Sequence, residues 1–155
     1  MSQDFLLKLA DFGFSSSDPV NQTYKGTSAY MAPEIQAGEE YSGASVDLFA
    51  AGIILYIMMV GRPCFHEAKP SDPYYKYMAA GKCDKFWAKH IKTFENGKDT
   101  FSDDWYDFIN WMLQYNPSDR LDMAALKSHP WYTAPMPTVD QINEEFANRW
   151  ESLCS

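Results

Sequence analysis

The feature that most constrains the fold of this chain is an uncharged apolar run from Leu48 to Val60. As a helix the run is apolar on every side, which in a soluble protein predicts burial around the whole circumference. Asp47 precedes it, and the glycine and proline at Gly61 and Pro63 predict its end. Because a bilayer span takes about 20 residues, we expect a core helix rather than a membrane segment.

Composition and charge narrow the class of protein. The 155 residues are 46% hydrophobic and 16% aromatic, which predicts one packed domain. The formal net charge is −8, and the sequence has no run of lysine and arginine. Since a phosphate backbone or an anionic membrane is bound by clustered basic residues, we expect no nucleic-acid partner and no membrane partner.

The cysteines indicate reduced thiols. Cys64, Cys83 and Cys154 lie far apart and no secretory signal accompanies them, so we expect a cytoplasmic protein, or alternatively a nuclear one. Cys64 and His66 form a Cys-x-His pair, but a zinc site needs a second pair of ligands that the sequence lacks.

Hydrophobic spacing predicts two further elements. A short strand is expected over Phe5–Ala10, where it runs into a turn. The clearest amphipathic helix is expected from Ser102 to about Tyr115, because its apolar residues recur at helical spacing. These residues are Trp105, Phe108, Ile109, Met112 and Leu113.

Capping signals predict three shorter or later helices. Asp72 followed by proline marks the start of one, with Gly81 at its end. Another begins after Asp122. The last follows Thr138, which forms a capping box with Gln141.

The sequence also contains an ordered series of short motifs. They are Asp11-Phe12-Gly13, GTSAYMAPE at 26–34, DLFAAG at 47–52, NPSDR at 116–120 and HPW at 129–131. Taken alone, Asp-Phe-Gly would be ordinary turn chemistry. In this order and spacing the motifs resemble the C-terminal half of a eukaryotic-type serine/threonine protein kinase domain, over about 5–131. The last motif is somewhat similar to that of calcium/calmodulin-dependent kinases.

The resemblance implies a mainly α fold, the helical C-lobe of a protein kinase with a short strand at the N-terminus. The N-lobe and the catalytic loop would be absent. Residues 1–132 would form a partial kinase domain of activation segment and C-lobe helices, and 133–155 a C-terminal helical tail.

The resemblance assigns a metal role to Asp11 and substrate roles further on. In the family the residue at Asp11 binds Mg²⁺ between the phosphates of ATP. Gly26, Thr27 and Tyr30 belong to the loop that receives the peptide substrate, where Thr27 would hydrogen-bond toward the catalytic base; a solvated loop hydroxyl is the alternative. By its position Thr23 is the expected phosphosite.

Two structural roles are implied as well. Glu34 is expected to pair with Arg120 and to tie the substrate loop to the helical base. Asp47 is expected to be a core anchor that accepts hydrogen bonds from the catalytic loop, or else to cap its own helix. Phe49 stands where the family usually has tryptophan, and we expect it to keep the packing role.

Parts that phosphoryl transfer needs are not found in these residues. The sequence has neither a Gly-x-Gly-x-x-Gly loop nor a His-Arg-Asp triplet. We therefore expect no catalytic residue in this chain. A complete kinase would use Mg²⁺ and ATP, whereas this chain alone is expected to bind neither.

Two hypotheses of different class remain open. The chain is part of a serine/threonine kinase that phosphorylates protein hydroxyls, or it is a non-catalytic, pseudokinase-like binding or scaffold module. In both, the partner is a protein, either a substrate or a protein that covers the exposed core of the C-lobe.

Overall fold

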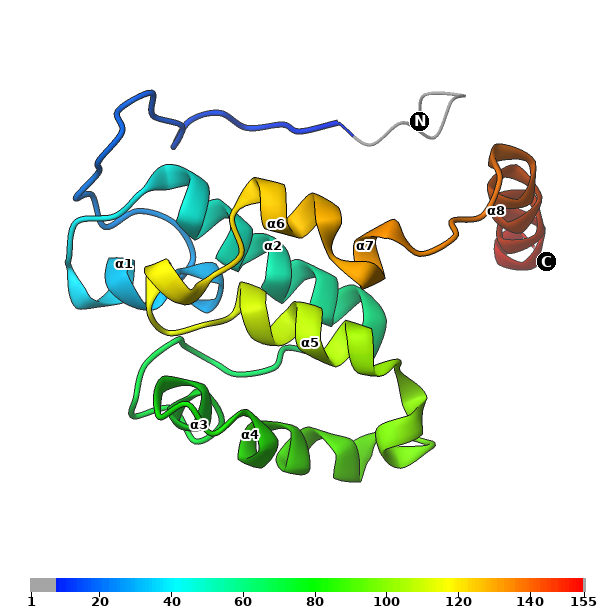
Figure 1. Ribbon diagram of the computed structural model, residues 1–155. Coiled ribbons are helices and arrows are strands. Elements are labelled where there is room, and N and C mark those ends of the chain that lie inside the picture. The colour runs from blue at the N-terminus through cyan, green and yellow to red at the C-terminus, as the bar shows by residue number, and fades with distance from the viewer. Residues whose placement is uncertain (1–7, 155) are drawn as a thin grey trace.

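The computed structural model describes residues 8–154, with only the backbone of Cys154, and is mainly helical (Figure 1). The mainly α prediction is confirmed. The α-helices of the described part are α1 (Pro33–Ala37), α2 (Gly43–Val60), α3 (Tyr75–Ala79), α4 (Cys83–His90), α5 (Asp103–Met112), α6 (Met123–Ser128), α7 (Pro130–Thr133) and α8 (Val139–Cys154). Single 3-10 turns, Ser28–Tyr30, Ile91–Thr93, Gly97–Thr100 and Pro117–Asp119, connect them.

Helix α2 is the centre of the molecule and packs along α5 (Figure 1). Gly52 makes this approach close, because a Cβ there would lie 2.8 Å from Cβ of Met112. Phe49, Ile53 and Tyr56 extend from α2 into the main core and are at most 2% exposed. The expected core helix therefore exists, and it begins at Gly43 rather than at Asp47.

Helix α2 is buried on its inner face and not on its whole circumference, so the exposed core expected of an isolated C-lobe lies on its outer face. Ile54 is 49% exposed, Met58 is 72% exposed and Met59 is 44% exposed. With 18 residues, α2 is the one described helix that is long and apolar enough to cross a membrane, by length and composition only. Core helices pass the same test, and the inner face of α2 packs into the core.

Half of the predicted strand, Phe5–Leu7, lies outside the described residues. Lys8, Leu9 and Ala10 are described and form no strand. The β-bridge seen within residues 8–154 pairs Asn21 with Tyr41. A strand needs a partner for its backbone groups, and no other described segment lies alongside these three residues as a ladder.

Helix α3 begins at Tyr75, later than expected. The reason is that the Asp72 carboxylate does not cap the helix alone but accepts backbone N–H groups from two segments of the chain. One carboxylate oxygen of Asp72 accepts the N–H groups of Tyr74 and Tyr75, at 2.8 Å each. The other accepts the N–H groups of His66 and Glu67, at 3.1 and 3.3 Å. Asp72 is only 6% exposed, so these four bonds satisfy a buried charge.

Helix α4 completes an aromatic cluster around His90. The hydroxyl of Tyr56 and Nδ1 of His90 lie 2.9 Å apart in a hydrogen bond, and the ring of Trp87 stacks on that of Tyr56. Burial lowers the pKa of His90 to about 4, so the ring is neutral at pH 7. Burial also raises the pKa of the Cys64 thiol, which makes it a packing residue rather than a reactive one.

The predicted helix near Ser102 is confirmed as α5, although it ends at Met112. The hydroxyl of Ser102 accepts the N–H of Trp105 at 3.2 Å. The whole predicted stripe is at most 3% exposed. Its members are Trp105, Phe108, Ile109, Met112 and Leu113. Asp122 likewise caps α6, through the N–H of Ala125 at 2.8 Å.

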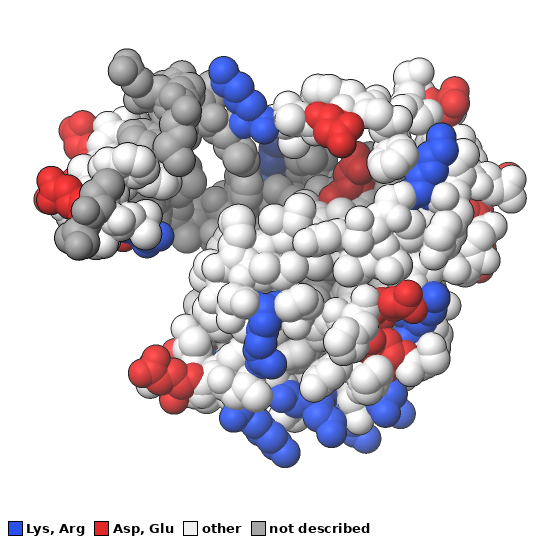
Figure 2. Space-filling view, turned by 180° about the vertical axis from the view of Figure 1, so that it is seen from behind, with Lys and Arg blue, Asp and Glu red and all other residues white. Residues whose placement is uncertain are grey.

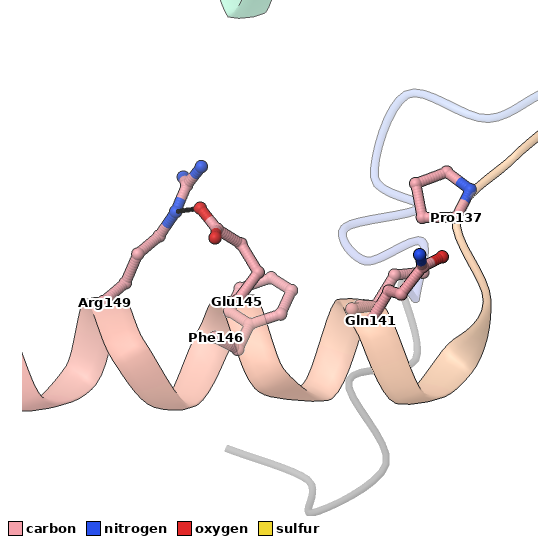
Figure 3. Close-up of a pocket in the computed structure, with 6 residues that line it drawn as sticks. Pro137, Gln141, Glu145, Phe146 and Arg149 are labelled. Atoms are coloured by element: carbon pink, nitrogen blue, oxygen red, sulfur yellow. Dashed lines mark hydrogen bonds and ion pairs between the residues drawn. The ribbon is translucent and has the colours of Figure 1, made fainter.

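Helix α8 follows α7 at one end of the molecule (Figure 1). Its capping box is confirmed: the N–H of Thr138 donates to Gln141, and the N–H of Gln141 donates back to the Thr138 hydroxyl. Figure 3 shows the side chains that line a hollow of about 440 Å³ along this helix, among them the Glu145–Arg149 ion pair at 2.7 Å.

Candidate functional site

A hollow of about 490 Å³ lies between the segment 13–31 and the start of α2. Thr23, Gly26, Thr27, Tyr30 and Asp47 all line it, so the structure brings together five of the residues singled out from the sequence. Asp11, Glu34 and Arg120 do not line it. The hollow is open and has both polar and apolar walls.

The loop at the mouth of this hollow is shaped by its backbone. Gly26 has φ 111°, a conformation that side chains with a Cβ rarely adopt. The carbonyl of Thr27 accepts the N–H of Tyr30 at 3.0 Å, which closes a 3-10 turn over Ser28–Tyr30. Tyr30 is 41% exposed and available to a ligand.

Gln36, on α1, hydrogen-bonds to this loop through its side-chain amide. Its Nε2 donates to the carbonyl of Ser28 at 3.0 Å and to that of Met31 at 3.1 Å. Sequence reasoning missed Gln36, since a glutamine two residues after a motif carries no signal of its own. Its two bonds fix the turn that contains Tyr30.

Thr23 is held by Tyr41, which sequence reasoning also missed. The Tyr41 hydroxyl donates to the Thr23 carbonyl at 3.0 Å, and the two hydroxyl oxygens lie 3.1 Å apart. Asn21 and Tyr41 exchange both backbone hydrogen bonds at 2.9 Å. The exposed hydroxyl of Thr23 is therefore anchored to the connection between α1 and α2.

Glu34 and Arg120 form a buried bidentate ion pair. The two guanidinium nitrogens donate to the two carboxylate oxygens at 2.6 Å each, and both side chains are at most 2% exposed. Arg120 also donates to the carbonyl of Gln114 at 2.9 Å, and its guanidinium carbon lies 4.8 Å from the ring centre of Phe49. The pair joins α1, directly after the loop, to the segment that follows α5.

Asp47 lies on the second turn of α2 and is exposed. Ser42, not Asp47, is at the N-cap position, so the alternative reading of Asp47 as a helix cap was wrong. Within residues 8–154 no hydrogen bond to its carboxylate is found. Ala51, Ile54 and Met58 follow it at helical spacing, and all three are exposed.

Comparison with known proteins supplies the family. A model of the protein kinase domain matches residues 1–132. The chain belongs to the protein kinase family. It is 31% identical to a human SNF-related serine/threonine-protein kinase, over 92% of this chain and 19% of that protein. It is 29% identical to CBL-interacting protein kinase 11 of rice, over 91% of this chain and 26% of that protein.

A third relative is the serine/threonine-protein kinase SRK2J of Arabidopsis thaliana, 33% identical over 84% of this chain and 38% of that protein. The kinase chain described here thus spans between about a fifth and two fifths of the length of these relatives. Its relatives support a serine/threonine kinase domain.

Kinases use Mg²⁺ and ATP, and the described residues offer only a small part of such a site. Asp11 is exposed, has φ 63° and accepts the N–H of Gly13 at 3.2 Å. Residues 8–154 contain no group of three or more acidic, histidine or cysteine side chains placed to hold a metal ion. One carboxylate suits Mg²⁺ as a ligand, but it does not hold a metal–nucleotide complex by itself. Residues 8–154 therefore fit only part of a metal–nucleotide site.

Proposed function

We propose that this chain forms the substrate side of a serine/threonine protein kinase domain. The complete domain would transfer the terminal phosphoryl group of ATP to hydroxyls of a protein substrate. The buried pair of Glu34 and Arg120 carries the proposal, because it anchors α1, whose Gln36 hydrogen-bonds to the loop beside the open hollow. Gly26, Thr27 and Tyr30 would receive the peptide there.

The chain alone is proposed to be catalytically inactive. Phosphoryl transfer relies on positioned phosphates and metal ions, and these residues contain no glycine-rich loop and no catalytic His-Arg-Asp. Asp11 would contribute one oxygen ligand to Mg²⁺ within the complete kinase. In that setting Thr23 would be the regulatory phosphosite, since a phosphate on its exposed hydroxyl adds charge to the segment.

The exposed stripe of α2 supports the proposal that this chain is only part of a kinase domain. Asp47, Ala51, Ile54 and Met58 lie on one face of a core helix, and that face is open to solvent. An apolar face of this kind normally packs against another element. We propose that helices from the other half of the kinase domain pack on this stripe, where Asp47 would accept hydrogen bonds from the catalytic loop.

The same stripe also favours the second candidate function, a non-catalytic, scaffold-like module completed by a partner protein. The two candidate functions predict different masses for the native polypeptide. Its mass would lie near 17.8 kDa for a stand-alone module and near twice that for a kinase domain.

Activity is tested by joining this chain to the N-lobe and catalytic loop of the human SNF-related kinase. We expect the chimaera to phosphorylate a serine/threonine peptide library, and the chain alone to give no signal above background. Asp11→Asn in the chimaera should abolish activity, whereas Lys127→Gln on α6 should leave it unchanged. Phosphorylation by the chain alone, free of other kinases, would refute the proposal.

A further inference from the structure

Four lysines lie along one exposed side of α4, its N-cap residue and the turn that follows it. Lys82, Lys85, Lys89 and Lys92 are spaced by three, four and three residues, which places them on the same face of a helix. All four are exposed, while Phe86, Trp87 and His90 of the same helix are buried. We call the four residues the lysine stripe.

The charge of the lysine stripe is not neutralised within residues 8–154. None of the four takes part in an ion pair found there. Residues 75–93 contain five lysines and a single acidic residue, Asp84. This segment therefore has a net charge of +4, whereas the whole chain has a net charge of −8. In Figure 2 the basic side chains gather along the lower edge of the molecule, where α3 and α4 lie in Figure 1.

This clustering escaped the sequence analysis because other residue types separate the four lysines. A search for runs of basic residues finds none, yet a helix brings residues three and four apart onto one side. The sequence therefore has no run of basic residues, whereas the folded surface has a cluster of them.

We propose that the lysine stripe is a docking surface for an acidic segment of a partner protein. At the rise of an α-helix, the ten positions from Lys82 to Lys92 span about 15 Å, so the stripe matches about three turns of a partner helix with glutamates at the same spacing. Carboxylates on such a segment meet ammonium groups that form no ion pair within the described residues. Opposite charges of this kind steer association and set specificity.

Other anions fit the lysine stripe less well. A nucleic acid carries charge far beyond 15 Å, and it would run onto the rest of the chain, which is strongly acidic. A membrane surface would need apolar side chains beside the lysines, but the large apolar residues of α4, Phe86 and Trp87, are buried. The stripe also lies away from the hollow at residues 13–50, so this inference does not depend on the proposed kinase function.

Fluorescence anisotropy with labelled synthetic peptides tests the proposal. The probe is an alanine- and glutamine-based helical peptide with glutamates at positions i, i+3, i+7 and i+10. A peptide of the same composition, with its glutamates spread around the helix, is the control. We expect the matched peptide to bind at least about threefold more tightly, and its affinity to fall as KCl rises from 50 to 200 mM.

Charge-reversal variants of the whole chain then locate the surface. Lys85→Glu with Lys89→Glu should weaken binding of the matched peptide at least about tenfold. Lys8→Glu with Lys127→Glu changes the net charge equally on other exposed residues and should weaken it less than about twofold. Thermal melting checks folding, and Lys85→Gln with Lys89→Gln should give an intermediate affinity.

Three results would overturn the proposal. They are equal binding of both peptides, equal effects of the two reversal pairs, and tighter binding to phosphatidylserine vesicles or to duplex RNA than to the matched peptide. The last would show that the lysine stripe recognises another class of anion.

Discussion

The strongest quantitative prediction concerns the ion pair of Glu34 and Arg120. Glu34→Ala leaves Arg120 buried, with carbonyl acceptors on Gln114 and Tyr115 but without an opposite charge. Because both side chains are at most 2% exposed and two bonds of 2.6 Å are lost, we expect a loss of about 3–5 kcal/mol in unfolding free energy.

Urea unfolding followed by tryptophan fluorescence measures this loss. Arg120→Ala should cost a similar amount, while the double change Glu34→Leu with Arg120→Met should cost less than the sum, because neither charge is then stranded. Amide hydrogen exchange should speed up over residues 26–31, since α1 also carries Gln36, which holds that loop.

An exposed ion pair in the same chain serves as the control. Glu145 and Arg149 lie 2.7 Å apart on α8, and their side chains are 58% and 72% exposed. Glu145→Ala should change stability by no more than about 0.5 kcal/mol, as is usual for surface pairs. If Glu34→Ala cost as little as this control, the anchoring role assigned to the buried pair would be refuted.

Four further predictions follow from individual residues. Asp47→Ala should cost less than about 0.5 kcal/mol in urea unfolding, because its exposed carboxylate has no partner in the described part of the chain; a loss above about 1 kcal/mol would reveal one. Gly52→Ala should destabilise by about 1–3 kcal/mol, because the new Cβ would lie 2.8 Å from Met112; an unchanged urea midpoint would show that α2 and α5 can separate freely. Burial lowers the pKa of His90 in the folded chain to about 4. Between pH 6.5 and pH 4 this histidine therefore binds a proton in the unfolded chain but not in the folded chain. Stability should be full above pH 6.5 and fall toward pH 4 by up to about 1.36 kcal/mol per pH unit, and His90→Gln should remove this slope in pH-dependent unfolding. Finally, Mg²⁺ and ATP should not raise the melting temperature of this chain, because Asp11 alone does not hold them; a clear rise in scanning fluorimetry would contradict the incomplete fit.

Local signals in the sequence were sufficient for several elements. The stripe from Trp105 to Leu113 follows from helical spacing alone, and Ser102, Asp122 and Thr138 mark helix starts because each side chain caps a backbone N–H within three residues. Such interactions depend on neighbours along the chain, so they can be predicted from the sequence before any fold is known.

The motifs of the sequence were likewise sufficient to indicate the kinase family, and the family implied that Glu34 and Arg120 would meet. The distance of 86 positions between them shows why no local pattern could have done so. Asp72 looked like a simple helix cap, and only the folded chain shows that it also binds the turn at His66.

What the sequence determined by itself was five of the helices, the caps at Ser102, Asp122 and Thr138, and the family to which the chain belongs. The tertiary structure alone decided which face of α2 is open, that Tyr41 holds Thr23, and that four separate lysines form one charged stripe. The physical reason is that spacing along a helix shows which residues share a face, whereas burial and charge on that face depend on what packs against it.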